Sequence, residues 1–377
     1  MSNKLIRLSK SCISDAEKNA VISVLNEEYL GMGKHVQEFE IALAEYLDNK
    51  VSCVNTGTSA VQLALEAVGC SNGKEVLVPS LTYLATYQAI SATGAKPISC
   101  DIDSSGLLCL DDCKTKLTEN TVAIVPVFYA GVTNNHDEYL KFAKLNNLEC
   151  VFDAAHAFGS LFNKKIIGSG DGTYCFSFDG IKNITCGEGG CVSSSNQNII
   201  DKVNTSRQLG ITGEHLAKYS GNRLWVFDVT SQGWRYHMSN INAAIGNAQL
   251  KRFDDLKNTR QNIARLYDES FKDNNNIKCF DNNYDDVVPH IYVVRIPNLD
   301  KRDKLREDLL ASGIETGVHY FPNHLLSLYK INNEHLPRTE KLFKEILTLP
   351  IHPDVSEIDV ARVSDVLKSL VKEKRYY

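Results

Sequence analysis

The sequence of 377 residues has no hydrophobic run long enough to cross a bilayer, and its first residues lack the apolar segment of a secretory signal. It also lacks any cluster of lysine and arginine that could follow a phosphate backbone. The formal net charge is -5, and both signs are scattered along the chain. These absences predict a protein that binds neither a membrane nor a nucleic acid, and the odd number of dispersed cysteines suits a reducing, cytoplasmic environment.

Metal-ligand and phosphate-loop patterns are missing as well. The 11 cysteines lie dispersed between Cys12 and Cys279, and the close pairs at 109/113 and 186/191 have no His or Cys partner at zinc-finger spacing. No G-x-G-x-x-G run follows a predicted strand, and GCSNGKE from residue 69 is one residue short of a Walker loop. We therefore expect no metal, no disulfide framework, and no Rossmann or P-loop nucleotide site.

Short apolar runs that alternate with helical stretches are what the sequence does have. The runs cover residues 51–54, 75–80, 96–102, 122–128, 148–153, 173–178 and 190–195. Helical periodicity covers residues 14–30, 34–47, 59–69, 83–94 and 137–147. Because the runs are almost entirely apolar, both faces of the strands should be buried. This pattern predicts an α/β fold with a mostly parallel central sheet flanked by helices.

The pattern changes in the last third of the chain. A long helical stretch covers residues 240–271, followed by a strand at 290–296, a helix at 301–313, a strand at 314–319 and a helix after Ser356. We interpret this region as a smaller α+β domain. The expected division is a large domain over residues 1–248 and a small one over residues 249–377.

One stretch, FSFDGIKNITCGEGG from residue 176 to 190, contains a single lysine among aromatic, small and amide residues. Lysine ordinarily lies on a solvated surface. Lys182 instead follows a run that is typical of a buried strand. An apolar neighbourhood would leave part of its amine unprotonated and available to react.

Other polar or aromatic residues follow the ends of predicted strands. Asp153 ends one strand, with His156 about one helical turn further on; Tyr83 follows another, and Gly57 and Thr58 lie in the turn before a helix that begins near Ser59. The carboxyl ends of parallel strands meet at one edge of the sheet, where such folds bind ligands. Each residue also has an ordinary interpretation, as a helix cap, a structural histidine or a core aromatic.

Together these residues meet the needs of pyridoxal 5'-phosphate (PLP). Its phosphate needs backbone N–H groups at a helix start and hydroxyls, and Ser177 supplies one of the hydroxyls. Its ring needs an aromatic face, and its pyridine nitrogen needs a carboxylate. Its aldehyde needs a lysine.

Longer motifs carry a family resemblance over essentially the whole chain. They are YLGMGKHVQEFEIALAEYL, NTGTSA, VPSLTYLAT, DAAHAFG, FSFDGIKNITCGEGG, YHMSNINAAIGNAQL, HYFPNHLLSLY and LPIHPDV. With them the chain resembles the DegT/DnrJ/EryC1/StrS sugar-nucleotide aminotransferases, which have the type I aminotransferase fold. The resemblance implies a homodimer in which each active site is shared between two subunits.

The resemblance also implies roles for individual residues. Lys182 would bind PLP covalently and move a proton between cofactor and sugar, and Asp153 would pair with the pyridine nitrogen. His156 would contact the ring hydroxyl and Tyr83 would stack on the ring. The residues implied for the phosphate are Gly57, Thr58, Ser177 and, from the partner subunit, Arg235. Those implied for the substrate are His319, Tyr320 and His324.

The branch of the family is indicated by KNITCGEGG and by PVFYAGV from residue 126. Both are similar to motifs of aminotransferases that act at carbon 4 of 4-keto-6-deoxyhexoses. We expect transfer from L-glutamate to C4 of a dTDP-linked sugar of the viosamine type, for a surface polysaccharide such as O-antigen. The alternatives are a GDP-linked sugar of the perosamine type, transfer at C3 or to a cyclitol ketone, and a non-catalytic regulator. A further alternative is cofactor-dependent dehydration or epimerisation at the same site, and dehydration is disfavoured because residue 182 is a lysine where the dehydratases of the family have a histidine.

Four positions depart from the family pattern. Arg235 replaces an asparagine, His237 an arginine, Phe128 a histidine and Asn323 an apolar residue. These changes concern recognition of the sugar and the phosphate, and they leave the residues expected to perform transamination in place.

Overall fold

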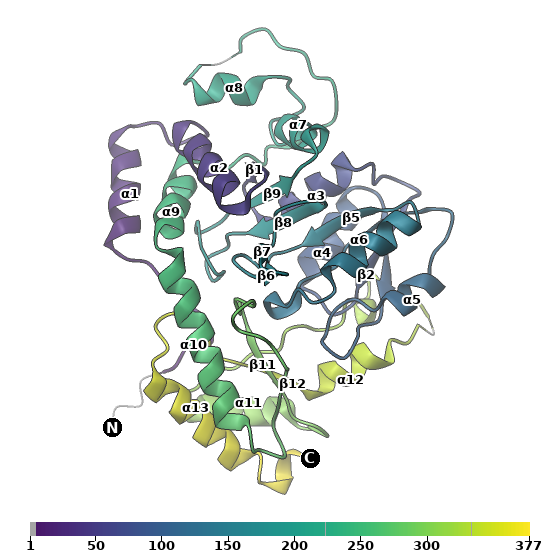
Figure 1. Ribbon diagram of the computed structural model, residues 1–377, viewed down its shortest axis with the longest axis vertical. Coiled ribbons are helices and arrows are strands. Elements are labelled where there is room, and N and C mark those ends of the chain that lie inside the picture. The colour runs from purple at the N-terminus through teal and green to yellow at the C-terminus, as the bar shows by residue number, and fades with distance from the viewer. Residues whose placement is uncertain (1–4, 223, 333) are drawn as a thin grey trace.

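A seven-stranded sheet forms the centre of the larger part of the molecule (Figure 1). The computed structural model describes residues 5–222, 224–332 and 334–377. The strands of this sheet are β1 (Lys50–Val54), β2 (Glu75–Pro79), β3 (Lys96–Cys100), β4 (Thr121–Ile124), β5 (Glu149–Asp153), β8 (Thr173–Ser177) and β9 (Gly190–Ser194). A separate hairpin pairs β6 (Leu161–Phe162) with β7 (Lys165–Ile166).

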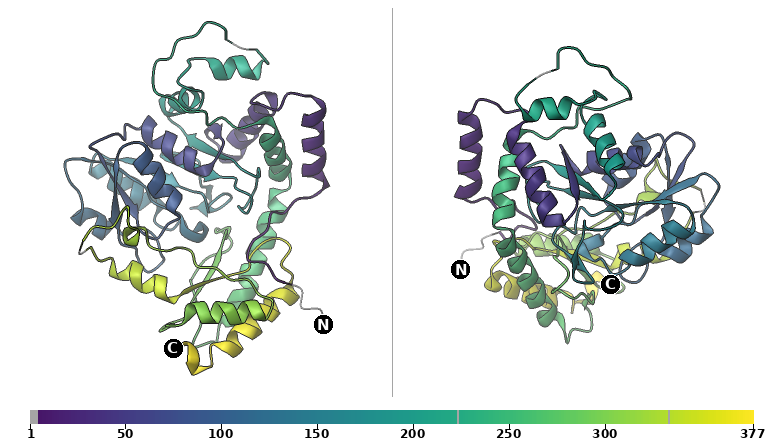
Figure 2. Two further views of the ribbon diagram at one scale, coloured as in Figure 1. Left: turned by 180° about the vertical axis from the view of Figure 1, so that it is seen from behind. Right: turned by 45° about the horizontal axis from the view of Figure 1, so that its top comes forward.

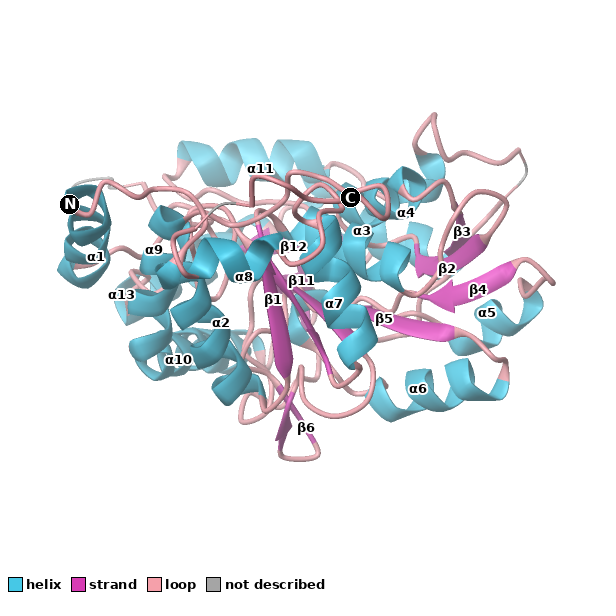
Figure 3. Ribbon diagram, turned by 90° about the horizontal axis from the view of Figure 1, so that it is seen from above, coloured by secondary structure: helices cyan, strands magenta, loops and turns pink. Residues whose placement is uncertain are grey.

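The strand order is β1-β9-β8-β5-β4-β2-β3, and β9 alone runs against its neighbours in this sheet. The predicted α/β class with a mostly parallel sheet is therefore confirmed. Helices cover both faces (Figure 3). On β5, for example, Val151 joins the core under α3, whereas Phe152 joins the core under α2 and α6. Burial on both faces explains why the strands contain so few polar residues.

The helices around this sheet are α1 (Asp15–Asn26), α2 (Lys34–Leu47), α3 (Gly57–Ala67), α4 (Leu84–Ala92), α5 (Leu110–Thr115), α6 (His136–Leu145), α7 (Gln197–Ser206) and α8 (Glu214–Tyr219), with a 3-10 turn η1 (Tyr129–Gly131). Five of them, α1, α2, α3, α4 and α6, begin and end close to the predicted positions, whereas α5, α7 and α8 were not predicted. The first helix begins where the sequence predicts, because Ser14 and Glu17 form a capping box.

The long helical pattern that starts at residue 240 forms two helices, α9 (Asn240–Lys251) and α10 (Phe253–Phe271). Arg252 separates them, with a non-helical backbone. Its guanidinium donates to the Cys12 carbonyl and to Glu17, both at 2.6 Å. The break therefore coincides with a side-chain anchor to the N-terminal segment. As Figure 1 shows, α10 continues from the larger part into the smaller one.

The smaller part contains a three-stranded antiparallel sheet, β10 (Lys278–Cys279), β11 (Tyr292–Arg295) and β12 (Ile346–Leu349). Its other elements are α11 (Arg302–Ala311), η2 (Asn323–Leu325), α12 (Pro337–Glu345), α13 (Glu357–Leu370) and η3 (Lys374–Tyr376). The strand predicted at residues 314–319 is wrong: that segment forms only isolated bridges, at Ile314 and Gly317. Gly317 forms a bridge to Thr348 of β12. The strand that pairs with β11 in place of the predicted one is therefore β12, later in the chain.

The N-terminal segment before α1 packs against this smaller sheet. Ile6 lies in its core, and the backbone of Ile6 bonds to Gly313 and Glu315. Figure 2 shows the described segment before α1 beside the C-terminal helices. We propose that the domain division at residue 248 holds with one change: the segment before Lys10 belongs to the smaller unit. Within the described residues, no helix is long and apolar enough to cross a membrane.

At Gly246, helix α9 packs closely against Phe39 and Cys186, and a substitution there tests how much this contact stabilises the fold. A Cβ at this position would lie 2.5 Å from Cζ of Phe39 and 2.7 Å from Sγ of Cys186. We expect Gly246→Ala to lower the free energy of unfolding by about 2 kcal/mol, because overpacking outweighs the helix propensity of alanine. Chemical denaturation measures this, with Gly31→Ala as the control because nothing lies within 4 Å of its Cβ position. Equal stability of the two variants would contradict the packing argument.

Candidate active site

The site lies at the edge of the sheet where β5 and β8 end. Ser177, the last residue of β8, pairs with Gly190, the first residue of β9. Because β9 is antiparallel to β8, the connection over residues 178–189 leaves and re-enters the sheet at this same edge. Lys182 belongs to that connection and therefore stays above the strand ends, as the sequence predicts.

A cavity of about 460 Å³ opens at this edge. Its walls include most of the predicted site residues, which come from β5, β8, the starts of α3 and α4, and the smaller unit. The lining residues include Gly57, Thr58, Tyr83, Thr86, Asp153, His156, Ser177, Asp179, Lys182, His290, His319 and Tyr320. The fold thus brings together segments more than 200 positions apart in the sequence.

The Lys182 side chain keeps part of its surface open to the cavity, while protein atoms enclose its amine. Its pKa is lowered from 10.5 to about 8, chiefly by burial; the carboxylates of Asp153 and Asp179 oppose this shift, and the positive charge of Arg260 contributes to it. An amine with such a pKa exchanges its proton readily near neutral pH, as a general acid and base must.

Asp153 lies at the end of β5 and accepts hydrogen bonds from Thr86 Oγ1 at 2.6 Å and from the Ala155 N–H at 3.1 Å. Burial raises the pKa of its carboxyl in spite of these donors. A desolvated carboxylate is stabilised by a cationic partner, which is what a protonated pyridine nitrogen offers. Sequence reasoning missed Thr86, because a threonine within a helix carries no local signal of its partner.

His156 and the two tyrosines form one wall. His156 Nε2 and the Tyr320 hydroxyl share a hydrogen bond of 3.0 Å, and the Tyr83 and Tyr320 rings lie 5.6 Å apart. Burial lowers the pKa of His156 well below its usual value, so the imidazole is neutral. Its Nδ1 is buried without a partner in the described part of the chain. Tyr83 is 61% exposed, so its ring is open to a ligand at the mouth of the cavity.

The start of α3 and the end of β8 form a cradle for an anion. Gly57 and Thr58 are the first helical residues, whose N–H groups have no carbonyl one turn earlier to bond. A Cβ on Gly57 would lie 2.6 Å from Cβ of Ser177, so only glycine lets the serine hydroxyl approach the helix start. The arrangement fits a phosphate group.

Two expected site residues do not line this cavity. Arg235 is exposed, and its backbone bridges to Gln208. His324 is only 1% exposed; its ring bonds to Ser80 Oγ at 2.7 Å and lies 3.3 Å from Glu340. Its neighbour Asn323 donates to the Ser80 and Thr82 carbonyls. His324 and Asn323 thus anchor the segment that positions Tyr320 and do not face the cavity.

The other departures from the family pattern are also structural in this chain. Phe128 is fully buried and stacks on Phe152, with ring centroids 5.0 Å apart. His237 pairs through its backbone with Val54, next to the anion cradle, and burial lowers its pKa to about 4. Neither side chain lines the cavity.

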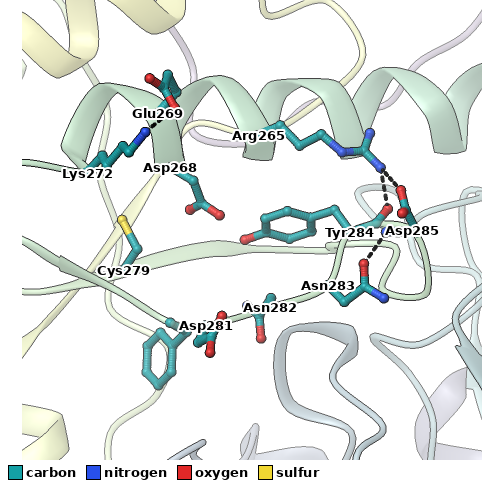
Figure 4. A pocket seen from close by; sticks show the side chains of 11 residues that line it. Arg265, Asp268, Glu269, Lys272, Cys279, Asp281, Asn282, Asn283, Tyr284 and Asp285 are labelled. Atoms are coloured by element: carbon teal, nitrogen blue, oxygen red, sulfur yellow. Dashed lines mark hydrogen bonds and ion pairs between the residues drawn. The ribbon is translucent and has the colours of Figure 1, made fainter.

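A second cavity, of about 510 Å³, lies beside α10 (Figure 4). Its charged side chains mostly pair with one another: Arg265 lies 2.7 Å from Asp285, and Lys272 lies 3.7 Å from Glu269. Asp268 accepts a hydrogen bond from Tyr292 at 2.6 Å. This cavity offers neither an amine enclosed by protein nor a helix start, whereas the first cavity has both.

Solved structures of aminotransferases share this architecture. Helicobacter pylori PseC, an aminotransferase involved in the biosynthesis of pseudaminic acid, has a TM-score of 0.91 at 26% identity, covering 98% of this chain and 100% of that one. Spr1654 of Streptococcus pneumoniae in its PLP form has a TM-score of 0.89 at 27% identity, covering 98% and 99%. Fold and site together define a PLP-dependent aminotransferase with the type I fold.

The family follows from the sequence comparison. Residues 11–368 match the DegT/DnrJ/EryC1/StrS aminotransferase family. A Campylobacter jejuni UDP-4-amino-4,6-dideoxy-N-acetyl-beta-L-altrosamine transaminase is 33% identical over 380 residues, which cover 98% of each chain. The chain belongs to the DegT/DnrJ/EryC1/StrS aminotransferase family, and it is a sugar aminotransferase that uses PLP. The expected family, fold and cofactor are confirmed.

The burial of Lys182 has a measurable cost. Its pKa falls from 10.5 in the unfolded chain to about 8 in the folded protein, so the folded state binds this proton less tightly. This destabilisation by Lys182 has its full size below about pH 8 and disappears above about pH 10.5. We expect Lys182→Met, in cofactor-free protein, to raise the free energy of unfolding by about 3 kcal/mol at neutral pH.

Denaturation at a series of pH values checks this expectation. The advantage of the variant should shrink as the pH rises from about 8 to about 10.5. Lys164→Met, at an exposed position, is the control. An advantage that is absent, or that does not change with pH, would mean that the folded state does not disfavour a charged Lys182.

Proposed function

We propose that the protein transfers an amino group from L-glutamate to C4 of a 4-keto-6-deoxyhexose linked to a nucleoside diphosphate. The observation that carries the proposal is the buried Lys182 amine, which shares one cavity with the Asp153 carboxylate and the anion cradle at Gly57. The cavity beside α10 does not combine these groups, and neither do the cavities lined by Glu66 and Trp234 or by Tyr129 and Phe280.

Each residue has a part in this proposal. When bound, PLP supplies an electron sink that stabilises negative charge on the substrate carbon. Asp153 holds a proton on the pyridine nitrogen, and His156 orients the ring hydroxyl. Tyr83 covers the ring face, and the cradle formed by Gly57, Thr58 and Ser177 binds the phosphate. Lys182 holds the cofactor, and its Nζ then takes and returns the proton that moves during transfer.

The position of transfer is inferred from the motifs and the relatives. KNITCGEGG resembles the motif of family members that act at carbon 4 of the sugar. The C. jejuni relative is named for a sugar that carries a 4-amino group. That sugar is linked to UDP, whereas the motifs favour dTDP. We propose dTDP as the first candidate nucleotide, with UDP and GDP as the alternatives to be tested against it.

The proposal extends to assembly. Arg235 is exposed and lies outside the cavity of its own chain. We propose that in a homodimer it binds the cofactor phosphate of the partner subunit, because guanidinium and phosphate form charge-assisted hydrogen bonds. The product would supply the synthesis of a surface polysaccharide such as O-antigen, in the cytoplasm.

The visible absorbance of the purified protein tests the first half of the reaction. We expect a yellow band from PLP bound to Lys182, and L-glutamate should convert it to the band of the pyridoxamine form. Lys182→Ala should abolish the conversion, with a fall in turnover of at least about a thousandfold. Lys164→Ala, at an exposed lysine, should behave as wild type. A Lys182→Ala variant with full turnover would refute the proposed role of this residue.

The sugar is tested separately. The glutamate-loaded enzyme is offered dTDP-, UDP- and GDP-linked 4-keto-6-deoxyhexoses, and the product is analysed by NMR. We expect an amino group on C4, formed fastest from the dTDP-linked sugar. An amine on C3, or amination that does not depend on the nucleotide, would contradict the proposed position or substrate class.

A further inference from the structure

The imidazole of His290 lies beside Lys182 and has no role in the proposed mechanism. His290 Nε2 lies 3.3 Å from Lys182 Nζ, within hydrogen-bond distance. His290 comes from the segment that precedes β11, 108 positions away in the sequence. It is 4% exposed, and it lines the same cavity.

His290 is a neutral partner. Burial lowers the pKa of its imidazole well below the usual value, and the positive charge of Lys182 adds to the effect. Its Nδ1 has no hydrogen-bond partner in the described part of the chain. The tautomer of a histidine is set by the bond that its other nitrogen makes, and here nothing sets it. Nε2 is therefore free either to accept a hydrogen bond or to donate one.

The backbones that carry Lys182 and His290 are tied together by Arg260 of α10. Its guanidinium donates to the carbonyls of Ile181 and Lys182 on one side, and to those of Pro289 and His290 on the other, at 3.3–3.5 Å. Among the described residues Arg260 forms no ion pair with a carboxylate, and it is 2% exposed. This buried cation fixes the spacing of the two segments and opposes a further positive charge nearby.

We propose that His290 is a positioning residue for Lys182: its Nε2 accepts a hydrogen bond from the Lys182 ammonium, donates one to the free amine, and so holds Nζ in place in both protonation states. A carboxylate at this position would also orient the amine, but it would stabilise the charged form and keep the proton on it. A neutral imidazole orients Nζ without that cost. The role deepens the proposed function, in which Lys182 takes up and returns a proton.

The test measures the proton affinity of Lys182 directly. Cofactor-free, full-length protein is labelled with a trace of acetic anhydride across a pH series, and mass spectrometry of the peptide that contains Lys182 gives the pH at half-maximal reactivity. The titratable and charged groups that surround Lys182 stay unchanged: Asp153 and His156 at the end of β5, Asp179 on its own loop, Arg260 on α10, and His319 and Tyr320 from the smaller unit.

We expect His290→Leu to lower this midpoint by about one pH unit, because a hydrogen bond to a charged group is stronger than one to a neutral group. His290→Gln should stay near wild type, since its amide reaches the place of Nε2 and can accept or donate. Looser packing would have the opposite effect: water would enter and raise the midpoint. The two causes therefore differ in sign.

His136→Leu is the matched control, because this histidine stacks on Phe152 outside the cavity. If His290→Leu does not fold, His290→Asn replaces it: its amide is too short to reach Lys182, and the same downward shift is expected. An unchanged or raised midpoint, or equal shifts in the Leu and Gln variants, would overturn the proposal. Because the labelling uses no cofactor, glutamate or sugar, this result is independent of the tests of the proposed function.

Discussion

Burial of the Lys182 amine is the constraint on which the rest of the site depends. Removing an ammonium group from water costs free energy, and this cost appears as a lowering of the Lys182 pKa to about 8. Asp153 and Asp179 limit that drop, while Arg260 adds to it. The balance leaves an amine that both gains and loses a proton near neutral pH. An exposed lysine would stay charged, and a lysine paired with a close carboxylate would hold its proton.

The topology of the sheet makes this burial possible. Reversal of β9 returns the chain to the edge at which β8 ends, so that Lys182 lies over the strand ends beside Asp153 and the start of α3. The smaller unit then closes the cavity with His290, His319 and Tyr320. The Tyr129 hydroxyl donates to the His319 carbonyl at 2.5 Å, and Asn323 bonds to the β2–α4 connection. The two parts of the molecule therefore build one site.

The sequence indicates the residues expected to bind the ligand more clearly than the residues that position them. Lys182, Asp153 and the helix start at Gly57 are recognisable in the sequence because each ends or follows a predicted strand and belongs to a family motif. The supporting residues Thr86 and Arg260 lie in helices and look ordinary there. His324 belongs to a family motif, which favours a role in substrate binding. Its ring instead contacts Ser80 and Glu340, outside the cavity.

The sequence by itself determined the α/β alternation, the helical character of residues 240–271, the family and most of the residues that line the cavity. These depend on local periodicity, on capping and on residue type, which neighbours along the chain reveal. The tertiary structure decided the third strand of the small sheet, the place of the N-terminal segment beside it, and the contact between Lys182 and His290. Hydrogen bonding and loss of solvent depend on distance in space, and residues 108 positions apart become neighbours only when the chain folds.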